Sequence, residues 1–65
     1  MALGFSFRLE LADGTPAEPP VLRTAVANWR VGDVIPLPRG QDLRVIATVA
    51  SATEDEAPVL VVEPA

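Results

Sequence analysis

The stretch Trp29-Arg30-Val31-Gly32-Asp33-Val34-Ile35-Pro36-Leu37 decides the fold, because it joins a Gly-Asp turn directly to an apolar run. Gly32 can take the positive φ that a tight turn requires, and Asp33 can accept hydrogen bonds from nearby backbone amides. The apolar run favours a strand, and Pro36, which has no N–H to donate, places that strand at a sheet edge or with that amide position facing outward. We therefore expect a type I turn within residues 28–33, closed by Gly32, followed by a short edge strand over 34–37.

The rest of the chain reads as short strands separated by turns. Phe5–Leu11 alternates apolar and polar residues, which predicts a strand with one buried face, and Asp13-Gly14 then marks a turn. Residues 15–20 contain three prolines, so they are expected to form an extended connection on the surface. Three further strands are expected over residues 21–26, 43–52 and 59–62.

Two of these strands carry further expectations. Ile46 breaks the alternation of the strand over 43–52, which predicts that the strand changes its buried side at a kink near Ala47. The unbroken apolar run Val59–Val62 predicts burial on both faces. Pro38-Arg39-Gly40 has the composition of a type I turn, and residues 53–58 that of a charged loop.

Five short strands without a convincing helix predict an all-β fold in a single domain spanning residues 1–65. A small SH3-like barrel of five strands fits this length best, because closure protects the sheet edges. An OB-like barrel is the alternative, but it usually needs more residues and a helix between strands.

Composition argues against catalysis and against a metal or cofactor site. The chain has 65 residues and contains no Cys, His, Lys or Tyr. Serine and threonine therefore have no His, Cys, Lys or Tyr to activate them, and a structural zinc site has no soft ligands. Only carboxylates remain as an acid or base, and an enzyme would need at least two of them to converge in a pocket. The acidic run Glu54-Asp55-Glu56 could attract calcium, but its spacing matches no alternating ligand loop, and a solvated loop is the simpler interpretation. We expect no enzyme activity, no cofactor and no small-molecule ligand.

The charge balance limits the partners. The net charge is −4, from nine carboxylates and five arginines. Nucleic-acid binding is disfavoured because it depends on clustered positive charge. It stays the alternative hypothesis, and it requires the arginines to converge around Trp29. No segment predicts a signal peptide or a bilayer-spanning run, so a cytoplasmic protein without membrane contact is expected.

Trp29 and Arg30 are the candidate interaction residues. Tryptophan and arginine are enriched at interface hot spots. The competing interpretation, which the few aromatics of so small a domain favour, is that Trp29 plugs one end of the barrel and Arg30 is simply exposed in the turn. Pro16-Ala17-Glu18-Pro19 has P-x-x-P spacing with an acidic insert, but a stiff connection explains it more economically. The expected function is a non-enzymatic interaction module that acts through self-association or a protein partner.

The chain also resembles small β-barrel proteins of high-GC bacteria. The resemblance rests on Leu11-Ala12-Asp13-Gly14-Thr15-Pro16, on the Trp29–Leu37 segment and on Val59-Leu60-Val61-Val62-Glu63. It covers nearly the whole chain, and it implies a barrel fold but no known activity.

Overall fold

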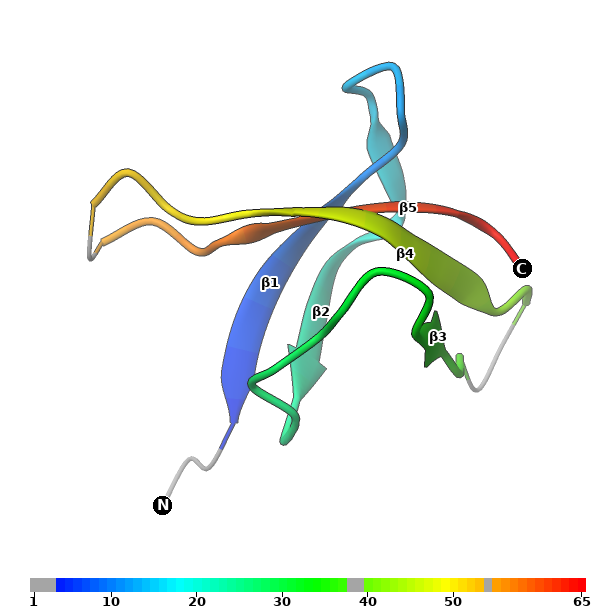
Figure 1. Ribbon diagram of the computed structural model, residues 1–65, viewed down its shortest axis with the longest axis horizontal. Coiled ribbons are helices and arrows are strands. Elements are labelled where there is room, and N and C mark those ends of the chain that lie inside the picture. Colours follow the sequence, from blue (N-terminus) through cyan, green and yellow to red (C-terminus); the bar gives the residue numbers. More distant parts are fainter. Residues whose placement is uncertain (1–3, 38–39, 54) are drawn as a thin grey trace.

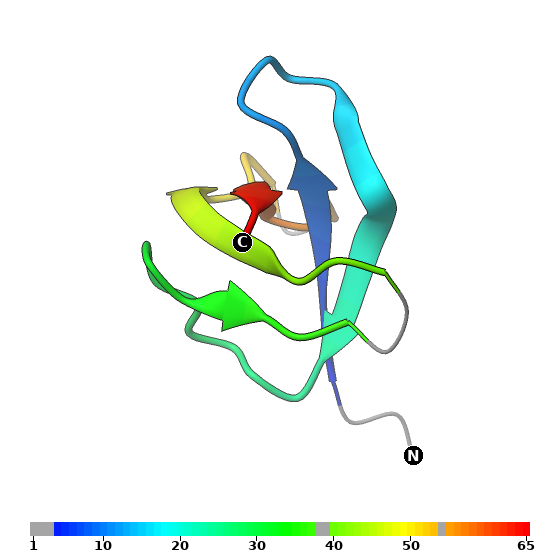
Figure 2. The ribbon, with the colours of Figure 1, turned by 90° about the vertical axis from the view of Figure 1, so that its right-hand side faces the viewer.

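A computed structural model describes residues 4–37, 40–53 and 55–65. It contains five strands and, in the described residues, no helix. The strands are β1 (Phe5–Glu10), β2 (Pro16–Thr24), β3 (Val34–Ile35), β4 (Leu43–Val49) and β5 (Val59–Pro64). They form one sheet in the order β2-β1-β5-β4-β3, which curls into a half-barrel (Figures 1 and 2). The expected all-β, five-stranded fold is confirmed.

The two strands furthest apart in the sequence lie at the centre of this sheet. β1 and β5 run parallel, with Arg8 opposite Val59 and Leu9 opposite Leu60, while the other neighbouring strands are antiparallel. β2 and β3 are the two edges. The prediction of an edge strand here is confirmed, but β3 is only the pair Val34–Ile35, so Pro36 and Leu37 lie outside it.

The core fills the concave side of the sheet. Among the residues that the structure describes, it comprises eight buried side chains, with Leu9, Ile35, Val45 and Val62 almost wholly excluded from solvent. In β5, Leu60 and Val62 are buried while Val59 and Val61, on the opposite face, are only half-buried. The prediction that both faces of this strand are buried is therefore only partly right: the face of Leu60 and Val62 is buried, and the face of Val59 and Val61 is partly exposed.

The proline-rich segment is not the connection that we expected. β2 begins at Pro16 and continues through the prolines to Thr24, with a cis peptide bond between Glu18 and Pro19. Its pairing with β1 jumps from Arg8 opposite Val21 to Glu10 opposite Pro16, so the residues between Pro16 and Val21 bulge out of the ladder. An edge strand tolerates prolines because its outer side needs no N–H donors.

β4 changes its buried side at a β-bulge, as its sequence predicted. Val45 lies opposite Val62, but Ala47 lies opposite Val61, so Ile46 is the extra residue. Since directly opposed residues share a face, Thr48 then joins Leu60 on the concave side and Val49 turns to the outer face. The expected kink is confirmed, and β4 ends at Val49 rather than Ala52.

Candidate functional site

The Gly-Asp turn is fixed by hydrogen bonds in both directions. The Asp33 N–H donates to the Arg30 carbonyl oxygen at 3.0 Å, and the Arg30 N–H donates to Asp33 Oδ2 at 2.9 Å. Gly32 has a φ of +98° at the third turn position. A positive φ there, without one at the second position, defines a type II turn, so the expected type I turn is wrong.

Two further bonds attach this turn to the sheet. Gly32 N–H donates to the Val45 carbonyl oxygen, and Val45 N–H donates to the Asp33 carbonyl oxygen, both at 2.8 Å. These bonds extend the β3–β4 ladder into the turn. The turn therefore holds the preceding residues, including Trp29 and Arg30, in a set position against the open end of the half-barrel.

Trp29 is placed as the plug interpretation expects, while its interaction role stays a prediction. Its side chain is partly buried and packs against the core, as a plug does. Its indole Nε1 is buried, yet it finds no hydrogen-bond acceptor among the described residues. Arg30, the next residue, is exposed.

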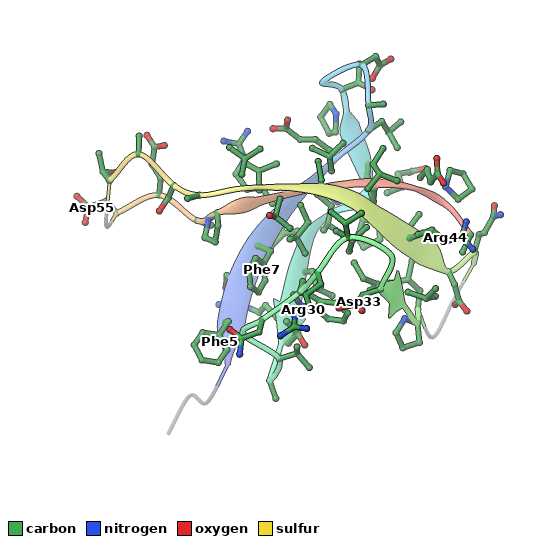
Figure 3. The ribbon with its side chains drawn as sticks, in the orientation of Figure 1. Phe5, Phe7, Arg30, Asp33, Arg44 and Asp55 are labelled. Carbon is green, nitrogen blue, oxygen red and sulfur yellow. The ribbon has the colours of Figure 1, made fainter. Side chains whose placement is uncertain are left out.

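Trp29 and Arg30 line an open groove of about 430 Å³, which we call the aromatic groove. Its other principal walls are Phe7 from β1, Thr48 from the end of β4, and Pro58 and Leu60 around the start of β5. Two of the three aromatic residues of the chain thus lie in one groove. The third, Phe5, is 49% exposed and lies two positions before Phe7 on the same face of β1 (Figure 3).

The groove was not visible in the sequence. Trp29 and Arg30 were predicted as candidates, but Phe7, Pro58 and Leu60 were missed as their neighbours. These residues meet because β1 lies parallel to β5, where the Arg8 N–H donates to the Pro58 carbonyl oxygen at 2.9 Å. No local pattern in the sequence predicts that β1 and β5 pair.

A second exposed apolar surface lies on the outer face of the sheet. Val21 and Val49 are each about half exposed there, in one row with Arg8 and Val59. The Arg8 guanidinium interrupts this row and lies 3.5 Å from the Glu10 carboxylate. Because a charged pair divides the apolar row, the aromatic groove is the better candidate site.

The four described arginines lie on different elements. Arg8 pairs with Glu10 on β1, and Arg44 on β4 lies 3.7 Å from Glu63 on β5. Arg23 is exposed on β2, and Figure 3 shows Arg30 on the turn, well apart from Arg44. Arg39 and the turn predicted around it, apart from Gly40, lie outside the described residues. The described arginines do not show the convergence around Trp29 that nucleic-acid binding requires. Nucleic-acid binding itself stays a prediction.

The acidic residues do not form a site in the part of the chain that is described. Asp55 lies at the far tip of the β4–β5 connection (Figure 3), and Glu54 falls outside the described residues. Within the described ranges, no group of three or more potential metal ligands comes together. None of the described segments is a helix long and apolar enough to cross a bilayer.

No protein-family model, curated protein or solved structure matches this chain. The site must therefore be interpreted from its own chemistry.

Proposed function

We propose that this domain is a non-enzymatic interaction module that binds a protein chain in the aromatic groove, through self-association or a separate partner. The observation that carries the proposal is the position of Trp29. A half-buried indole beside an exposed arginine, in a groove with apolar walls, has the composition of an interface hot spot.

The indole N–H of Trp29, which has no acceptor in the described ranges, supports a partner that brings one. A buried donor without an acceptor costs about 1–3 kcal/mol. The segment before the turn, residues 25–30, has no regular secondary structure. If binding repositions this segment so that Nε1 meets a carbonyl oxygen of the bound chain, that cost is removed.

The finer expectations remain proposals. The short strands and strong curl support an SH3-like barrel. The cytoplasmic location rests on the sequence alone. The absence of activated nucleophiles supports a role without catalysis.

Site-specific photo-crosslinking in cells tests the proposal. Asn28 is exposed and lines the aromatic groove, so a photoreactive residue at this position is expected to capture a bound protein chain. Arg23, exposed on the outer face of β2, is the matched control position. A crosslinked product from position 28 that is missing from position 23 supports the proposal. Equal or absent crosslinking from both positions contradicts it.

A further inference from the structure

A second groove lies at the opposite end of the half-barrel. It has a volume of about 620 Å³ and is lined mainly by Ala17, Glu18, Pro19, Pro20, Leu43 and Pro64, and we call it the proline groove. Its walls come from the start of β2, the start of β4 and the end of β5, whereas the aromatic groove uses the start of β5 and the end of β4. The two grooves therefore open at opposite ends of the molecule.

Resting on the interaction function proposed above, we infer that the aromatic groove binds the proline-rich segment Pro16–Pro20 of a second copy of this chain, with Arg30 facing Glu18. The segment is well placed to act as a ligand. Pro16, Glu18, Pro19 and Pro20 are all exposed, and only Ala17 points into the core. The bulge in the β1–β2 ladder carries these side chains away from the rest of the sheet.

The two surfaces match in apolar chemistry. Proline rings pack well on aromatic side chains, and a proline-rich segment loses little conformational freedom when it binds. β2 is an edge strand, so carbonyl oxygens on its outer side meet no neighbouring strand and remain available as acceptors. If the segment before the turn shifts on binding, one of these oxygens can accept a hydrogen bond from the buried Trp29 Nε1, which has no acceptor among the described residues.

The two surfaces also match in charge. The Arg30 guanidinium and the Glu18 carboxylate form no ion pairs with the described residues, unlike the pairs on β1 and between β4 and β5. Each copy carries a net charge of −4, so two copies repel unless opposite charges meet at the contact. Arg30 is the arginine that lines the aromatic groove, and Glu18 is the acidic residue that lines the proline groove.

The geometry makes this contact head-to-tail. Figure 1 shows the turn of the β1–β2 hairpin, beside which the segment begins, at the top of the molecule, whereas the connection from β2 to β3 starts at the bottom and rises to the middle. A copy cannot fill its own groove, so each copy offers one groove and one segment to different neighbours. Such a heterologous contact produces rings or open chains rather than a closed two-fold dimer. The contact is small, so weak and concentration-dependent association is expected.

Analytical ultracentrifugation of the full chain tests the inference. The wild type is expected to show masses above that of the 6.9 kDa chain as its concentration rises. Glu18→Arg and Arg30→Glu should each weaken association at least about tenfold, because like charges then meet. Asp55→Arg and Arg23→Glu are the matched charge controls, and they should leave association unchanged. Arg30→Gln removes the charge without adding repulsion near Asp33, and should weaken association less.

Mixing the two charge-reversed variants gives the decisive result. Neither variant pairs well with itself, but the groove of each is complementary to the segment of the other, so an equimolar mixture should regain association. The amide spectrum of ¹⁵N-labelled Glu18→Arg should then show a shifted Trp29 indole signal when unlabelled Arg30→Glu is added. Shifts confined to other residues would contradict the inference.

Failure of the inference can be told apart from failure of the proposed function. A wild type that stays at 6.9 kDa at every concentration overturns the inference. So does a mixture that fails to associate while the wild type does. In either case, a crosslink from position 28 to another protein, or to a different surface of a second copy, still supports the interaction function.

Discussion

Arg30 and Asp33 close the same turn from both sides, with the amide of each residue donating to an oxygen of the other. One bond is an ordinary turn bond between backbone groups. The other uses the Asp33 carboxylate, which occupies the Arg30 amide and so orients the chain just after Trp29. The position of the candidate site therefore depends on a residue outside the groove.

Replacing Asp33 by alanine should destabilise the domain. The change leaves the Arg30 N–H without its acceptor, and a net loss of about 1 kcal/mol in the free energy of unfolding is expected. Asp33→Asn keeps an oxygen at the same place and should lose less. Urea unfolding followed by Trp29 fluorescence measures both. Equal stabilities for the alanine and asparagine variants would show that the side-chain bond contributes little.

Gly32→Ala should cost about 1–2 kcal/mol, because a side chain disfavours a φ of +98°. A Cβ at this position would meet no atom within 4 Å, so the cost is conformational rather than a clash. Gly4→Ala is the control: its φ lies outside the left-handed region and its Cβ would make only an ordinary contact with the Thr24 carbonyl oxygen. Thermal unfolding should give a lower melting temperature than wild type for Gly32→Ala and an unchanged one for Gly4→Ala.

Thr15→Val should raise the pKa of Asp13. The Thr15 hydroxyl donates to Asp13 Oδ1 at 2.6 Å and the Thr15 amide donates to the same oxygen at 3.0 Å, and together they lower the pKa of Asp13 below 3.8. The variant keeps only the amide bond, so the pKa should move part of the way back. A carbon-detected NMR titration of the Asp13 carboxyl measures this shift.

The same pair makes a prediction for stability. Because folding lowers this pKa, the bonds to Asp13 stabilise the fold above the ordinary carboxyl pKa, and the effect disappears as the pH falls through the folded value. The stability difference between wild type and Thr15→Val should therefore shrink in acid below pH 3.8. A stability difference that stays constant as the pH falls well below 3.8 would show that the Thr15 hydroxyl does not lower the pKa of Asp13.

Leu9→Ala should leave much of the protein unfolded. Leu9 is 1% exposed, and a leucine-to-alanine change in a core costs about 2–5 kcal/mol. The total stability of so small a domain is only about 3–5 kcal/mol. Val21→Ala, on the exposed outer face, should change stability by less than about 0.5 kcal/mol. Circular dichroism at 25 °C distinguishes the two variants.

The sequence predicted the elements whose signals are local. The alternation of Phe5–Leu11 predicted β1 almost to the residue, and Ile46 predicted the bulge in β4. The start of β2 was missed because prolines exclude a central strand but not an edge strand. Which strand lies at an edge depends on the order of the whole sheet, which no local pattern encodes.

The candidate site was likewise predicted only where residue type gave a local signal. Trp29 and Arg30 stood out by residue type, and the structure places both in the aromatic groove. Their neighbours from β1 and β5 could not be predicted, because only the long-range pairing of these strands brings them to the turn. The turn type was wrong because type I and type II turns can both end in Gly-Asp, and φ at Gly32 alone distinguishes them here.

The central position of β5 has a consequence for how the protein folds. In the strand order, β5 is the strand that joins the β1–β2 hairpin to the β3–β4 hairpin. Each hairpin can form early from neighbouring residues, but neither can complete the core until the final strand inserts between them. Since such distant pairings form slowly, the rate of folding should depend on this insertion. During synthesis, the nascent chain acquires its sheet only after its last strand has been released from the ribosome.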